Sequence, residues 1–219
     1  MAKAKVSQKD KIIRAYMDFV LMNGKGPSNV FSFCKEHNFK EDQFYNYFGS
    51  FDAINKEVFS LFFDNASNLL ANSKDYQEFD TRNKLLTFYY TFFEVLKANR
   101  SYVVQILKNS DNTVESISLL AKLRHQFIDY LETLELSSMA SELGKLEELS
   151  KRGTKEVLWS QLLAILKFWL DDDSANFEKT DVFIEKSIKA GFDIMDTTPL
   201  KSVIDLGKFI FSEKIKPGF

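Results

Sequence analysis

With 219 residues, only 8 Gly and 3 Pro, the chain is long enough to bury a sizeable core and favours helices over β structure. A formal net charge of −2 excludes the general basic excess that marks many nucleic-acid binders, and a single Cys excludes an internal disulfide. The polar start, residues 1–11, has no apolar signal region, and the most apolar run, residues 157–170, is shorter than the ~20 residues that span a membrane. We therefore expect a soluble, cytoplasmic protein with no membrane span.

The first 60 residues predict a compact helical head. Residues 10–22 form an amphipathic pattern that breaker residues 23–27 end. Two short helices follow, Asn29–His37 and Glu41–Phe48, and Asn38 stands between them, where a residue that tolerates positive φ is needed. Gly49 ends the second helix, and Ser50 with Asp52 can cap a long helix from Phe51. This spacing predicts a helix-turn-helix.

The rest of the chain reads as further helices. We expect them at residues 51–73, 83–98, 102–108, 113–136, 137–152, 154–170, 177–195 and 200–212, with a loop at residues 72–81. About nine or ten helices and no strand make an all-α protein. Asp171, Asp172 and Asp173 could bind a cation, but an acidic loop at a helix end is the preferred interpretation.

The head resembles the DNA-binding part of the TetR family of bacterial regulators. Cys34, Asn38 and the stretch from Tyr45 to Ser50, which reads Tyr-x-x-Phe-x-Ser, stand where that family has a small residue, a turn residue and the same ending. The resemblance implies a helix-turn-helix head at residues 1–50 and a ligand-binding, dimerising body at residues 51–219. It implies a homodimer through the helices Thr154–Leu170 and Glu178–Met195, the first of which is apolar on two faces.

The candidate DNA contacts are polar positions of the head. Four of them, between Lys40 and Tyr47, are expected to face away from Phe44, Tyr45 and Phe48, and two lie at the start of the first short helix. Side-chain amides can read adenine edges, whereas Lys, Tyr and helix starts can hold phosphates. The alternative is that these residues are solvated or capping positions. The set comprises Ser28, Asn29, Lys40, Gln43, Asn46 and Tyr47.

The candidate ligand pocket is aromatic. Family members commonly bind small molecules in the body, so the resemblance implies an apolar effector there, although aromatic residues at helical spacing are more often ordinary core. The candidate residues are Phe62, Phe63, Phe88, Tyr89, Phe92, Phe127, Trp159 and Trp169. No metal cluster, phosphate loop or nucleophile motif is present, so we expect no enzyme, no metal and no cofactor.

Two functions from different classes fit this sequence. The first is a dimeric DNA-binding transcriptional regulator controlled by an apolar small molecule. The second is a protein of the same fold that binds a lipid or isoprenoid, or docks a partner, through a body whose head no longer reads DNA. Two departures from the family favour the second: the acids Glu41 and Asp42 begin the recognition helix, and Phe51 replaces a phosphate-binding Lys.

Overall fold

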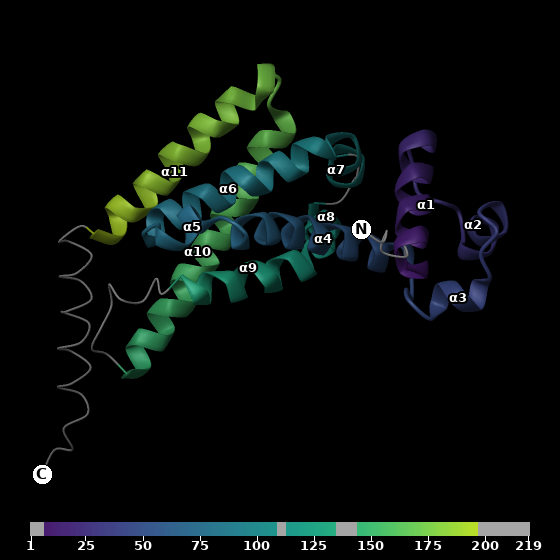
Figure 1. Cartoon of the computed structure of the whole chain (residues 1–219), viewed down its shortest axis with the longest axis horizontal. Coiled ribbons are helices and arrows are strands. Elements are labelled where there is room, and N and C mark those ends of the chain that lie inside the picture. Colours follow the sequence, from purple (N-terminus) through teal and green to yellow (C-terminus); the bar gives the residue numbers. More distant parts are fainter. Residues whose placement is uncertain (1–6, 109–112, 135–143, 197–219) are drawn as a thin grey trace, which may run out of the picture. The chain divides into compact units, whose positions relative to one another are not determined.

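The structure is a computed structural model that describes residues 7–108, 113–134 and 144–196. Every regular element within these ranges is helical, which confirms the all-α prediction, and the helices follow one another as drawn in Figure 1. No helix among these residues is long and apolar enough to cross a membrane. In chain order the helices are α1 (Gln8–Asn23), α2 (Val30–Glu36), α3 (Glu41–Tyr45), α4 (Phe51–Ala71), α5 (Lys74–Glu78), α6 (Thr81–Ala98), α7 (Arg100–Leu107), α8 (Thr113–Leu119), α9 (Ala121–Thr133), α10 (Gly144–Asp171), the 3-10 turn η2 (Ala175–Phe177) and α11 (Glu178–Asp196).

The predicted loop at residues 72–81 is wrong in part, because it contains the short helix α5. Ser73 caps this helix by accepting a hydrogen bond from the Tyr76 amide at 3.3 Å. The Tyr76 side chain is buried, and its hydroxyl lies 2.7 Å from the hydroxyl of Tyr130 on α9. Five residues carry too weak a periodicity to be seen in the sequence, so tertiary packing of Tyr76 decides this element.

Two predicted boundaries between helices are also wrong. The expected single helix at residues 113–136 is two helices, since the Leu120 amide turns back to the carbonyl of Ile117 at 3.0 Å instead of continuing the α pattern. Conversely, the expected break near residue 153 is absent, and α10 runs through Gly153. One glycine costs a helix about 1 kcal/mol, which the good helix formers around it outweigh. The final helix expected at residues 200–212 lies outside the described residues.

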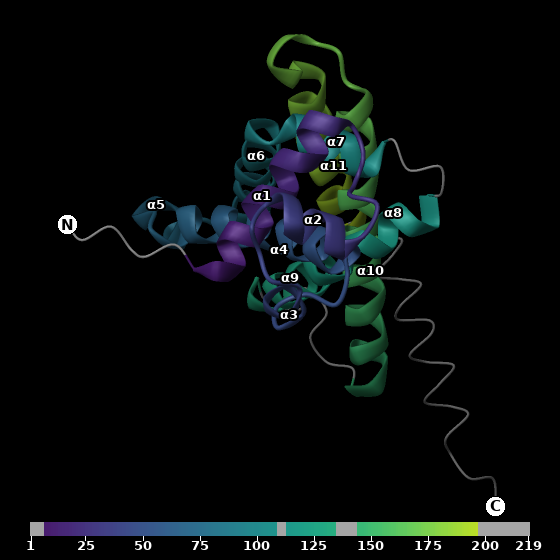
Figure 2. The ribbon, with the colours of Figure 1, turned by 90° about the vertical axis from the view of Figure 1, so that its right-hand side faces the viewer.

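The chain divides into two compact units, and each has its own apolar core. The first unit comprises Met1–Leu70 and Thr91–Phe127, and the second comprises Ala71–Tyr90 and Ile128–Phe219. In the first unit α1, α2 and α3 pack together beside the start of α4 (Figures 1 and 2). The expected domain boundary at residues 50 and 51 stays a prediction.

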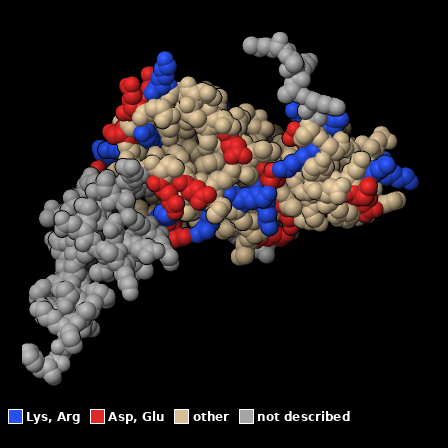
Figure 3. Space-filling view, turned by 60° about the horizontal axis from the view of Figure 1, so that its bottom comes forward, with Lys and Arg blue, Asp and Glu red and all other residues tan. Residues whose placement is uncertain are grey.

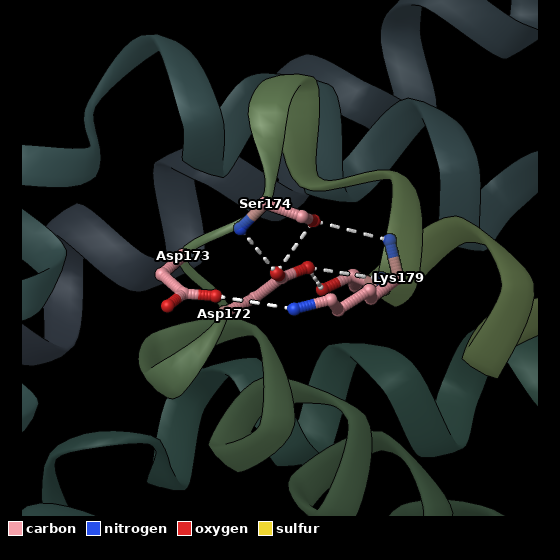
Figure 4. A network of polar contacts seen from close by, with 5 residues as sticks. Asp172, Asp173, Ser174 and Lys179 are labelled. Carbon is pink, nitrogen blue, oxygen red and sulfur yellow. Dashed lines mark hydrogen bonds and ion pairs between the residues drawn. The ribbon is translucent and has the colours of Figure 1, made fainter.

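In the second unit α10 and α11 are joined by a tight acidic connection (Figure 4). The buried Asp172 carboxylate accepts four hydrogen bonds there: from the Ser174 amide and hydroxyl at 2.9 and 2.6 Å, and from the Thr180 amide and hydroxyl at 3.0 and 2.6 Å. Burial disfavours the charged carboxylate, but these bonds outweigh it and lower the pKa of Asp172 to about 2. The acidic run therefore caps the start of α11, in keeping with the preferred interpretation.

Candidate nucleic-acid interface

The connection between α2 and α3 is a tight left-handed turn. Asn38 has a φ of 57°, as expected from its position, and the Phe39 amide donates to the carbonyl of Cys34 at 2.8 Å. This bond is the one that closes a helix end in the Schellman arrangement, where glycine is commoner but asparagine is tolerated. At its other end, α2 is capped by Asn29, whose side-chain oxygen accepts from the Ser32 amide at 2.8 Å. Two short helices are thus held in a helix-turn-helix arrangement.

An aromatic cluster holds this arrangement together. The ring of Phe33, which is 1% exposed, lies 4.7–6.3 Å from six other rings that come from α1, α2, the turn, α3 and α4. Edge-to-face and offset pairs at such distances stabilise beyond simple burial. The six rings belong to Tyr16, Phe19, His37, Phe39, Phe44 and Phe51.

Most of the candidate DNA contacts lie on the surface of the head. Ser28, Asn29, Lys40, Asn46 and Tyr47 are exposed, and the sixth candidate is half-buried. That sixth residue is Gln43, in the middle of α3.

Asn29 acts as a cap, and this role does not prevent a phosphate contact at the start of α2. Its Oδ1 is used by Ser32, while its Nδ2 donates to the Ser28 hydroxyl at 3.4 Å. On the inner side of α3, Phe44 and Phe48 are buried as expected.

The placement of Tyr45 on the apolar face of the second short helix is wrong. Its side chain is 52% exposed, because Tyr45 lies about 100° around the helix from the buried Phe44. Phe31 on α2 is likewise exposed, at 62%, and sequence reasoning did not select it. The signal was available, since Phe31 stands off the stripe formed by Val30, Phe33 and Cys34. Tyr45, Tyr47 and Phe31 make the exposed part of the head unusually aromatic.

The electrostatics of α3 are mixed. Lys40 precedes the helix, while Glu41 and Asp42 occupy its first turn and are exposed. Carboxylates there stabilise the helix through its dipole but repel phosphate. On the face drawn in Figure 3, Lys and Arg atoms are interspersed with Asp and Glu atoms rather than gathered in one basic field.

The long helix α4 is tied to its neighbours in the first unit by polar contacts. Glu57 pairs with Lys9 of α1 and with Lys122 of α9. Burial alone would raise the pKa of the Glu57 carboxyl, but the hydrogen bonds from the two lysines lower it below its ordinary value. Further along α4, Gln126 of α9 donates to Asp64 at 2.7 Å. A displacement of α4 would therefore break or strain its contacts with both α1 and α9.

The aromatic residues chosen as a ligand pocket are all buried. Four of them lie in each unit, so they form two groups: Phe62, Phe63, Phe92 and Phe127 in the first, and Phe88, Tyr89, Trp159 and Trp169 in the second. Burial does not distinguish the side chains of a core from those that line a filled pocket, so the pocket stays a prediction. Among the described residues, no group of three or more His, Cys, Asp or Glu side chains could hold a metal ion.

Fold and head together define an all-helical protein with an N-terminal helix-turn-helix. Residues 84–210 match the family described as "Tetracyclin repressor-like, C-terminal domain", which is more than half of the chain. The chain belongs to this TetR family of transcription regulators.

Solved structures share the fold. A structure titled as the fatty acid degradation regulator FadR from Bacillus halodurans has a TM-score of 0.53 at 17% identity, covering 84% of this chain and 95% of its own. A putative tetR family transcription regulator from Shewanella sp. PV-4 has a TM-score of 0.51 at 13% identity, covering 86% and 96%. No curated protein matches the sequence.

Proposed function

We propose that this TetR-family regulator binds operator DNA as a homodimer, with α3 of each subunit in a major groove. The proposal rests on the two sides of α3 and the turn that follows it. Phe44 and Phe48 are buried on the inner side, whereas Lys40, Asn46 and Tyr47 are exposed. A DNA-recognition helix must be fixed by packing on one side and exposed to solvent on the other.

The exposed groups have the chemistry that DNA reading needs. Asn46 and Gln43 carry amides that can pair with adenine edges, and Lys40 and Tyr47 carry a cation and a hydroxyl for phosphate oxygens. Ser28 and Asn29 open α2, where backbone amides also favour phosphate. Phosphate contacts make affinity depend on salt, whereas base contacts make it depend on sequence, so the two groups can be told apart by experiment.

Support for the homodimer comes from apolar side chains left exposed on α10 and α11. Val157 is 67% exposed, and Ala164 and Phe168 are exposed at i+7 and i+11, on the same side of α10. On α11, Val182 is exposed beside Phe183, whose ring stacks on Phe168 at 4.7 Å. A second copy of the same helices would cover this stripe, and a self-complementary patch is what a two-fold interface requires.

Control by an apolar small molecule is the remaining part of the proposal. The body is rich in buried aromatic side chains, and a ligand among them would act by binding one arrangement of the two heads better than another. Native mass spectrometry of the purified protein tests this part: a retained apolar compound supports it, and a ligand-free dimer whose DNA affinity no apolar compound alters contradicts it.

The DNA-binding proposal itself is tested by fluorescence anisotropy. Labelled duplexes from the region upstream of the protein's own gene should bind at low salt, and affinity should fall as salt rises. Tyr47→Ala and Asn46→Ala should weaken binding by roughly 5- to 150-fold each, as expected for lost base or phosphate contacts of ~1–3 kcal/mol. Met22→Ala is the matched control, because Met22 is an uncharged residue of α1 that is 86% exposed and lies outside the candidate set.

A second candidate function is favoured by one specific observation. Phe51, where the family often has a phosphate-binding Lys, stacks on Tyr16 at 5.3 Å and packs edge-on against Phe33 and Phe44. The Phe51 side chain therefore packs with the aromatic rings of the head and supplies no positive charge for a DNA phosphate. The exposed acids Glu41 and Asp42 lower the affinity for phosphate further. The alternative is therefore a lipid or isoprenoid binder, or a partner-docking protein, with a degenerate head. A retained lipid together with no DNA binding at low salt would favour it.

A further inference from the structure

A cleft of about 320 Å³ opens in the first unit beside the end of α1. Its lining comes from the loop after α1, from α4, from α7 and from α8, and it combines three aliphatic side chains with polar ones. The polar side chains belong to Lys25, Asn55, Gln105 and Glu115. A volume near 300 Å³ is at the small end of ligand-binding clefts, which suits a molecule of a few heavy atoms rather than a lipid.

Two of the polar side chains are held in place by the protein. Asn55 is 5% exposed, and its Oδ1 accepts a hydrogen bond from the Tyr102 hydroxyl at 2.7 Å. It also bonds to Tyr16, an interaction that opposes the rise of the Tyr16 pKa to about 12 caused chiefly by burial. The Gln105 amide donates to the carbonyl of Gly24, which ends α1 with a φ of 65°. The amides are thus positioned before any ligand arrives, which lowers the entropy cost of binding.

The other two polar side chains carry opposite charges. Lys25 lies in the loop after α1 and Glu115 in the first turn of α8, and both are exposed. Within the part of the chain that the structure describes, neither side chain forms an ion pair with the other or with a third residue. The cleft therefore presents one free cation and one free anion next to two fixed amides and an aliphatic wall.

We infer that this cleft binds a small zwitterion of the size of a free amino acid. The carboxylate of the ligand would meet Lys25 and its ammonium group would meet Glu115. Its side chain would lie against the aliphatic wall, within reach of the amides of Asn55 and Gln105. Charge-assisted hydrogen bonds of this kind are about twice as strong as neutral ones, so both charges of the ligand contribute to its selection.

The position of the cleft gives such a ligand a regulatory role. An occupant would bridge the loop at the end of α1 to α7 and α8, and the Gln105–Gly24 bond already joins the end of α1 to α7. This consequence rests on the proposed function: if the head binds DNA, a ligand that holds α1 against α7 changes operator affinity. The site is polar and small, so it differs from the apolar effector pocket proposed above.

Isothermal titration calorimetry of the full chain tests the inference, with each of the twenty common L-amino acids as the probe. At least one should bind with one site per chain. Lys25→Met and Glu115→Gln should each weaken its binding roughly tenfold or more, the effect of losing one charged hydrogen bond. Lys35→Met and Glu36→Gln make the same chemical changes at exposed positions of α2 outside the cleft, and they should leave the affinity within about twofold.

Three results would overturn the inference. The first is that no amino acid binds at 10 mM, a concentration set roughly by the weakest affinities of interest. The second is that the affinity is the same in Lys25→Met and Glu115→Gln as in the parent protein. The third is that acetate binds as tightly as the amino acid, which would mark a simple anion site. DNA binding is measured separately by anisotropy. Amino-acid binding without any DNA binding would refute the proposed function and leave the site standing.

Discussion

Phe33 and Phe31 stand two residues apart on α2, and the same substitution should strongly destabilise the protein at Phe33 and have little effect at Phe31. Phe33 is 1% exposed and its ring is surrounded by six others, whereas Phe31 is 62% exposed. Changing Phe33 to Ala removes the centre of the aromatic cluster, so α2 loses its contact with α1, α3 and α4 at once. Changing Phe31 to Ala removes only a surface ring.

The magnitudes follow from burial. Returning a fully buried Phe side chain to water costs about 1.5–3 kcal/mol, and the cavity left behind raises the total for Phe33→Ala to about 3–5 kcal/mol. Domains of this kind are stable by only about 5–15 kcal/mol, so this one change should remove a large fraction of the total stability. Phe31→Ala should change the unfolding free energy by less than about 0.5 kcal/mol.

Urea unfolding followed by circular dichroism measures both changes, and anisotropy measures DNA binding. Phe33→Ala should lower the unfolding midpoint and weaken DNA binding, while Phe31→Ala should leave the midpoint in place. Equal destabilisation by the two variants would refute the packing of α2, because it would mean that both faces of the helix are buried or that neither is.

Three further predictions concern other parts of the molecule. Asp172→Ala removes four hydrogen bonds at the start of α11 and should cost about 1–3 kcal/mol in urea unfolding. Because the folded pKa of Asp172 is about 2 and its ordinary value is 3.8, its stabilisation is complete above pH 4 and is lost as pH falls towards 2, so Asp172→Asn should flatten this part of a pH–stability curve. Phe168→Glu should shift the protein from dimer to monomer in analytical ultracentrifugation, whereas Lys167→Glu, on the neighbouring exposed position, should not. Glu57→Gln should lower stability by about 1 kcal/mol and reduce the dependence of that stability on salt, since it removes two ion pairs.

Local chemistry explains why the head was predictable. Asn38 was placed at positive φ from its position between two apolar patterns, and Ser50 was expected to cap α4, where it accepts from the Ala53 amide at 3.2 Å. The aromatic residues chosen as pocket candidates are buried, since helical spacing puts them on inner faces, and their role in a pocket stays a prediction.

The errors arose where tertiary packing overrides local pattern. α5 is too short to leave a periodic signal, and Gly153 reads as a break although α10 continues through it. Tyr45 was assigned to the apolar face with Phe44 and Phe48, but it lies about 100° around the helix from Phe44 and is exposed. The polar cleft beside α1 joins residues far apart in the sequence, from Val20 to Leu119, so no spacing rule could assemble it.

The salt dependence of DNA binding tests the central claim most directly. Anisotropy titrations of the dimer with upstream duplexes, repeated between 50 and 200 mM salt, give a slope of log affinity against log salt of about −0.9 for each phosphate neutralised. The account predicts a negative slope that becomes shallower by about two units when Lys40 is changed to Met, because a dimer then loses one phosphate contact in each subunit. Absence of binding at the lowest salt, or a slope that Lys40→Met leaves unchanged, would contradict the assignment of α3 as the DNA-reading helix.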